Sequence, residues 1–176
     1  MSAMLLKELA FIDLATKHLG FSNSEKKHMK VLVERGCVLS PQLWEMIVEK
    51  LTGSKFVNES KYDFEDFSEA KTGSCTSRPG SKGYYSYKGQ ITGVGGKLGY
   101  IRVALYNEYS RSIDFFLLPP DHSCNSYTAE MCPQAAIKFS YSRRDDTYSN
   151  GLEQYRVYKV EDVCSKIRVV KNKKAA

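Results

Sequence analysis

The sequence has few of the residues that build histidine or cysteine metal sites, and it has no nucleotide-binding loop. Its three histidines share no motif, and its five cysteines show no CxxC spacing. No GxxxxGK[ST] phosphate loop occurs, and the glycines of "ITGVGGKLG" do not match GxGxxG. A zinc site, a Ser/His/Asp hydrolase and a P-loop enzyme are therefore poorly supported. The scattered cysteines are expected to be ordinary reduced thiols: Cys37, Cys75, Cys124, Cys132 and Cys164.

Long hydrophobic runs are also missing. No apolar stretch approaches the roughly 20 residues that cross a bilayer. The N-terminal "MSAMLLKELAFIDLATKHLG" is interrupted by charges such as Lys7, Glu8 and Asp13, so it predicts an amphipathic helix and lacks the continuous apolar core of a signal peptide. We therefore expect a soluble cytoplasmic protein with no membrane partner.

The first third of the 176-residue chain has helical periodicity. Helices are predicted near 4–19, 24–35 and 41–52, the last two ending at Gly36 and Gly53. Ser40 followed by Pro41 indicates a capping serine with proline at the first helical position. Glu45 and Glu49 are four residues apart, so they share the polar side of the third helix.

After Gly53 the sequence favours β-structure. Strands are expected in 56–64, 67–72, 84–94, 99–109 and 112–119, with a loop at 75–83 and the apolar 112–119 strand in the centre of a sheet. Residues 121–134 read as irregular, 134–142 as a strand or short helix, and 151–167 as partly helical. The order predicts an α+β fold with a mixed central β-sheet flanked by helices. We divide it into an N-terminal helical segment (1–40), a core (41–170) and a mobile tail (171–176).

Positive charge is concentrated in one segment. Between Lys71 and Arg111 there are seven cations and one anion, so this segment carries the whole net charge of +6, and it also holds six of the twelve tyrosines. Clustered cations with aromatic rings are typical of a surface that binds a polyanion. A β-sheet with solvated lysines on one face and tyrosines on the other would give the same pattern. Nucleic acid is the favoured partner, with these expected contacts: Arg78, Lys82, Tyr84, Lys88 and Lys97.

Acidic and aromatic residues alternate in "KYDFEDFSEAKTG", residues 61–73. In a hairpin, a tight turn brings Asp63 beside Glu69, and strand alternation points Glu69 and Lys71 the same way. Two adjacent buried carboxylates repel each other, and a hard divalent cation such as Mg²⁺ or Mn²⁺ removes that cost. Lys71 could then hold a water for attack on a phosphodiester. A charged surface hairpin is the alternative.

The pattern Asp63-Phe-Glu-Asp-Phe-Ser-Glu69-Ala-Lys71 resembles the Asp…Glu-x-Lys motif of the PD-(D/E)XK nucleases, which include most type II restriction endonucleases. The motif covers nine residues and the wider resemblance about 45–120, although Tyr62 stands where the family has proline. The resemblance implies a restriction-endonuclease-like core and Mg²⁺ bound by Asp63, Glu69 and the Ala70 carbonyl. It also implies a water activated by Lys71.

The resemblance further implies a carboxylate from the preceding helix, with Glu49 favoured and Glu45 as the alternative. Double-stranded DNA is the implied substrate, and a homodimer is a further option. A non-catalytic nucleic-acid-binding domain that uses strands 71–111 is the alternative function. A third option is an interaction protein whose acidic hairpin docks a basic partner.

Overall fold

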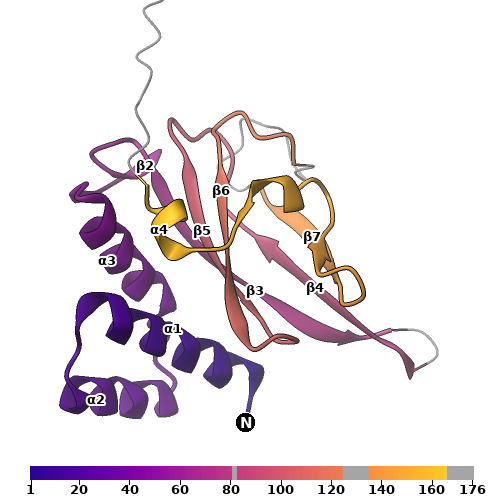
Figure 1. Ribbon diagram of the computed structural model, residues 1–176, viewed down its shortest axis with the longest axis horizontal. Coiled ribbons are helices and arrows are strands. Elements are labelled where there is room, and N and C mark those ends of the chain that lie inside the picture. The colour runs from indigo at the N-terminus through magenta and orange to yellow at the C-terminus, as the bar shows by residue number, and fades with distance from the viewer. Residues whose placement is uncertain (81–82, 125–134, 166–176) are drawn as a thin grey trace, which may run out of the picture.

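The computed structural model describes residues 1–80, 83–124 and 135–165. Three helices come first, and the strands follow (Figure 1). The helices are α1 (Ala3–Leu19), α2 (Asn23–Glu34), α3 (Ser40–Thr52) and the short α4 (Val160–Val163), with a 3₁₀ turn at Glu153–Tyr155. The strands are β1 (Phe56–Glu59), β2 (Tyr62–Phe64), β3 (Glu69–Pro79), β4 (Tyr85–Ile91), β5 (Ile101–Asn107), β6 (Ser112–Leu118), β7 (Ile137–Ser142), β8 (Thr147–Tyr148) and β9 (Arg156–Val157).

Seven strands form one curled, mixed sheet in the order β8-β7-β4-β3-β5-β6-β9. β3 and β5 are parallel, with Glu69 opposite Ile101, and the other neighbours are antiparallel. β1 and β2 pair separately as a two-stranded sheet. The α+β class and the mixed sheet with helices packed on it are thus confirmed.

The two faces of the sheet carry separate hydrophobic clusters. On one face Phe11 and Ile12 of α1 pack with Trp44 and Ile47 of α3, together with Ala70 of β3. On the other face the cluster is built from strand residues such as Val103 and Phe116 and from the segment around Leu152. The first helix therefore shares its core with the third helix.

The three predicted helices are confirmed, but the predicted cap of the third is wrong. Ser40 lies inside α3, and its hydroxyl donates to Glu8 Oε1 (2.9 Å). Glu8 Oε2 accepts the amides of Leu39 and Ser40, each at 2.8 Å. The buried carboxylate of α1 thus satisfies amides that a helix N-terminus leaves without intrahelical partners, and the negative charge suits that helix end.

Two strand predictions are corrected. The segment 75–79, expected in a loop, continues β3 to Pro79, because β4 supplies pairing from Ser74↔Gln90 to Pro79↔Tyr85. The 112–119 run is not central: β6 lies between β5 and the two-residue β9, next to the sheet edge. Its apolarity arises because both faces are covered, Phe115 by the helix-side cluster and Phe116 by the other.

The remaining assignments are mixed. Residues 137–142 form a strand, and 151–165 contain the 3₁₀ turn and α4 as expected. The predictions for Lys82, for Cys132 and for the tail 171–176 concern residues outside the described ranges. Within the described ranges, no helix is both long and apolar enough to span a bilayer.

Candidate active site

A tight reversal between β2 and β3 positions Asp63. The amide of Asp63 donates to the Ser68 carbonyl (2.9 Å), and Phe67 adopts a left-handed conformation with φ of 66°. Asp63 is 8% exposed, and its Oδ2 accepts the Ala70 amide at 2.9 Å. The turn was predicted, whereas the strand pairing differs, because β2 pairs with β1.

Glu69 is a buried carboxylate held by two lysines. Its Oε1 lies 2.5 Å from Lys71 Nζ and 2.7 Å from Lys97 Nζ. Lys97 is 8% exposed and Lys71 27%, so only Lys71 is open to a ligand from solvent. Glu69 Oε2 is buried and has no hydrogen-bond partner within the described ranges. Lys97 follows a glycine-rich loop, and no sequence motif pointed to it as a partner of Glu69.

The helix α3 contributes Glu45 to the electrostatics of this cluster. Burial raises the pKa of Glu45, and the carboxylates of Asp63 and Glu69 raise it further against the opposing charge of Lys71. Glu49 was predicted to be the carboxylate that this helix adds to the site, but its Oε1 instead accepts the amide of Phe56 (3.2 Å). The arrangement therefore favours Glu45, the predicted alternative, as the helix carboxylate near the site.

Asp63 is also destabilised in its charged form. Burial raises its pKa above the ordinary value, and Glu69 adds to the shift, while the Ala70 amide and the two lysines oppose it. Two neighbouring carboxyls, Asp63 and Glu45, thus share a raised pKa because they are partly removed from water near another negative charge. Perturbed acids of this kind are frequent at catalytic sites and also occur in structural clusters.

The other acids of the turn behave differently from each other. Glu65 is exposed to solvent. Asp66 is only partly exposed: it accepts the Ser68 amide and hydroxyl with Oδ1, and its Oδ2 lies 3.1 Å from Arg102 Nη2. Arg102 is 1% exposed and also donates to the Val163 carbonyl (2.7 Å). This ion pair fastens the turn to β5 and to the C-terminal segment.

The predicted DNA contacts do not share one location. Arg78 and Lys88 line a hollow on the sheet, and Tyr84 is 74% exposed near the end of the β3–β4 hairpin. Lys97 is committed to Glu69, and Lys82 lies outside the described residues. Arg102, another of the seven cations between Lys71 and Arg111, is buried. The cations available to a polyanion are therefore fewer than the sequence suggested.

The buried thiols described by the structure are poorly suited to nucleophilic chemistry. Burial raises the pKa of Cys75 to about 12, of Cys124 to about 11 and of Cys164 to about 12. A thiolate is the reactive form of cysteine, so these three residues are packing groups.

The cluster has the donor chemistry of a divalent cation site. Asp63 and Glu69 carry carboxylate oxygens, the type of ligand that Mg²⁺ prefers, and among the described residues the buried Glu69 Oε2 has no hydrogen-bond partner. The amide of Glu69 donates to the Tyr100 carbonyl in β5, so the main-chain groups of the next residue, Ala70, face the opposite edge of β3. β4 begins to pair with β3 only at Ser74, so no strand of the main sheet covers that edge at Ala70.

Two carboxylates alone make an incomplete coordination shell. Across the described parts of the chain, no group of three or more His, Cys, Asp or Glu side chains is placed so that it could hold a metal ion. Mg²⁺ is commonly bound by one or two carboxylates with waters and substrate phosphates as further ligands. The residues present therefore fit Mg²⁺ as an ion that binds together with a phosphate.

Comparison of the chain with protein-family models, with curated proteins and with solved structures gives no match.

The raised pKa of Asp63 predicts a pH-dependent difference in stability. The folded protein binds the Asp63 carboxyl proton more tightly than the unfolded chain does. The contribution of Asp63 to folding stability is therefore fully present below its unfolded pKa of about 3.9, and it is lost as pH rises through its folded pKa. In metal-free buffer, Asp63→Asn should therefore gain stability relative to the parent protein as pH rises from about 4 to 7. Urea unfolding in EDTA at several pH values measures the difference.

The exposed neighbour Glu65 supplies the control, because Glu65→Gln removes the same charge from the same turn. A Glu65→Gln profile that matches the Asp63→Asn profile would contradict the assignment of the effect to Asp63.

Proposed function

We propose that this protein is a Mg²⁺-dependent endonuclease with a restriction-endonuclease-like core, and that it hydrolyses phosphodiester bonds of double-stranded DNA. The observation that carries the proposal is the grouping of Asp63, Glu69 and Lys71 at one end of β3. Two carboxylates with low exposure lie beside a partly exposed ammonium, on a strand edge that the main sheet leaves uncovered. That grouping supplies metal ligands and a cation in the order that the Asp…Glu-x-Lys resemblance implies.

The roles follow from the contacts. Asp63 keeps Oδ2 on the Ala70 amide, so Oδ1 is the oxygen that would bind the ion, together with Glu69 Oε2, which has no hydrogen-bond partner among the described residues. When bound, Mg²⁺ would neutralise phosphate charge and make a bound water more acidic; Mn²⁺ could substitute. Lys71 holds the attacking water and stabilises the negative charge that develops on the phosphate oxygens. Lys97 is a positioning residue that fixes the Glu69 carboxylate from its buried side.

A plasmid assay tests the proposal. The purified protein is incubated with supercoiled plasmid and with phage DNA in Mg²⁺, in Mn²⁺ and in EDTA, and Asp63→Asn purified in parallel controls for contaminating nuclease. Metal-dependent cleavage that is absent from the variant supports the proposal, and discrete fragments would identify a sequence-specific restriction enzyme. Linear rather than nicked first products would support a homodimer that cuts both strands.

The same gels distinguish the alternatives. Retardation of the DNA without cleavage in either metal would favour the non-catalytic binding domain that uses strands 71–111. If the gels show neither cleavage nor retardation, the remaining alternative is an interaction protein whose acidic hairpin docks a basic partner. The proposed activity on chromosomal or invading DNA implies a cytoplasmic location.

A further inference from the structure

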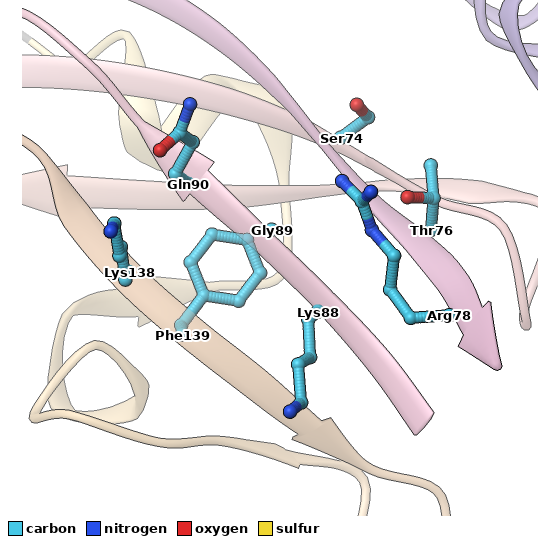
Figure 2. A pocket seen from close by; sticks show the side chains of 8 residues that line it. All are labelled: Ser74, Thr76, Arg78, Lys88, Gly89, Gln90, Lys138 and Phe139. Carbon is cyan, nitrogen blue, oxygen red and sulfur yellow. The ribbon is translucent and has the colours of Figure 1, made fainter. Parts of the chain in front are cut away.

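A hollow of about 400 Å³ lies on strands β3, β4 and β7 (Figure 2), and its lining does not include the acid cluster of Glu45, Asp63 and Glu69. We call it the sheet-face hollow. Figure 2 shows side chains from three strands around it: Ser74, Thr76 and Arg78 from β3, Lys88 and Gln90 from β4, and Lys138 from β7. Gly89 and Phe139, paired across β4 and β7, complete the lining.

The hollow and the acid cluster are on opposite faces of β3. Side chains alternate along a strand, so Ser74 and Arg78 share the face of Ala70, whereas Glu69 and Lys71 point to the other face. Ala70 packs under the helices, which gather at one side of the molecule, while β4 and β7 project away from them (Figure 1). This end of the helix-side face is therefore left polar and open.

The strand register brings the polar groups into adjacent rungs. Ser74 lies opposite Gln90, which in turn lies opposite Lys138. Thr76 lies opposite Lys88 in the rung two residues further along β3. Neighbouring strands are about 4.8 Å apart, so these hydroxyl, amide and ammonium side chains lie close together on two rungs of three adjacent strands.

The chemistry of the hollow suits an anion. The described residues of its lining include three cations and no carboxylate. Among the described residues, Arg78 and Lys88 form no ion pair with an acidic side chain. The side chains of Ser74, Thr76 and Gln90 likewise make no hydrogen bond to another described residue. Their hydrogen-bonding capacity is open to a ligand. Arginine's forked donors match phosphate oxygens, and serine, threonine and glutamine side chains are frequent phosphate contacts.

The hollow lacks a surface for stacking bases. Phe139 is the one aromatic residue among the described lining residues, and it is only 4% exposed, with its ring against Gly89. Proteins that hold single strands stack successive bases on exposed aromatic rings. Charge and hydroxyl groups without such rings favour the sugar–phosphate backbone of a duplex.

We propose that the sheet-face hollow binds the backbone of double-stranded DNA at a second place, separate from the phosphate that is cut. Ser74 is five residues beyond Glu69, and Arg78 is seven beyond Lys71. At strand spacing this is roughly 17–23 Å along β3, on the opposite face. The choice of DNA as the occupant rests on the proposed function, and the hollow adds an anchoring contact that the nuclease motif does not include.

The test compares a double variant of the hollow, Arg78→Ala with Lys88→Ala, with a control that removes two exposed helix charges, Lys27→Ala with Lys50→Ala. Binding of a labelled duplex is measured by fluorescence anisotropy at several salt concentrations in EDTA. The double variant should bind about tenfold more weakly or worse, and its log–log salt slope should fall by about two, because two phosphate contacts are lost. The control should bind like the parent protein.

Three results would overturn the proposal. In the first, the double variant is folded by circular dichroism and binds the duplex like the control; in the second, both variants lose the same affinity. In the third, inorganic phosphate at millimolar concentration abolishes duplex binding, and longer DNA binds no more tightly. The last would assign the hollow to a small anion. If the double variant does not fold, the single variant Lys88→Glu replaces it in the same anisotropy assay. This variant should abolish duplex binding.

Failure here is distinguishable from failure of the nuclease proposal. If the double variant of the hollow binds DNA normally and cleaves it in a metal-dependent way, the anchoring contact is contradicted and the nuclease proposal is supported. If duplex binding depends on Arg78 and Lys88 but no metal gives cleavage, the anchoring contact is supported and the nuclease proposal is contradicted.

Discussion

Lys71→Ala is expected to lower the rate of DNA cleavage by about 10² to 10³ while duplex affinity stays within about twofold. The ammonium is partly exposed beside Glu69, where it can stabilise charge that appears only in the transition state. Binding should survive because the sheet-face hollow is on the opposite face of β3. The fold should survive because Lys97 continues to neutralise Glu69 Oε1.

Single-turnover cleavage with saturating protein separates the chemical step from binding, and anisotropy measures affinity. Lys61→Ala is the matched control, since Lys61 is exposed two residues before Asp63 and should leave the rate unchanged. Cleavage by Lys71→Ala at a near-normal rate would show that Lys71 does not act on the reacting phosphate.

Glu69→Gln is expected to destabilise the metal-free protein by about 3 kcal/mol. Repulsion between Asp63 and Glu69, taken alone, predicts the opposite sign, because removing either charge would relieve it. The structure changes this expectation: Glu69 is the counter-ion of Lys97, whose side chain is 8% exposed. Removal of the Glu69 charge leaves the Lys97 ammonium buried and without this counter-ion. This destabilises the fold by more than the relief of the Asp63–Glu69 repulsion stabilises it.

Urea unfolding in EDTA measures this effect, with Glu65→Gln as a control of equal charge change. Combining Glu69→Gln with Lys97→Met should restore much of the lost stability, because the unpaired ammonium is then also gone. A Glu69→Gln protein that is more stable than the parent would mean that repulsion dominates and that Lys97 is well solvated.

Local patterns in the sequence were sufficient for the helices and for the class of the fold. The periodic apolar positions of α1 and α3 and the glycines at their ends act within a few residues, so the sequence shows them directly. The turn that brings Asp63 toward Glu69 was likewise predicted from strand alternation and spacing. These features depend on short-range geometry.

Long-range partners were not accessible in the same way. The lysine that holds Glu69 is 28 residues away, and the parallel pairing of β3 with β5 brings it there. Arg102 is one of the seven cations between Lys71 and Arg111, yet it lies in a strand that is buried along its whole length, which the charge pattern alone does not reveal. The preference for Glu49 over Glu45 likewise depended on how α3 sits against β2 and β3.

The cap that Glu8 places on α3 has a consequence for how independently parts of this chain can evolve or be exchanged. The first turn of α3 takes its amide partner from α1, so the N-terminus of α3 is tied to a residue 31 positions earlier than Leu39. A graft of the β-sheet with α3 onto another scaffold would leave the Leu39 and Ser40 amides without the Glu8 carboxylate. The N-terminal helix should therefore be transferred together with the site.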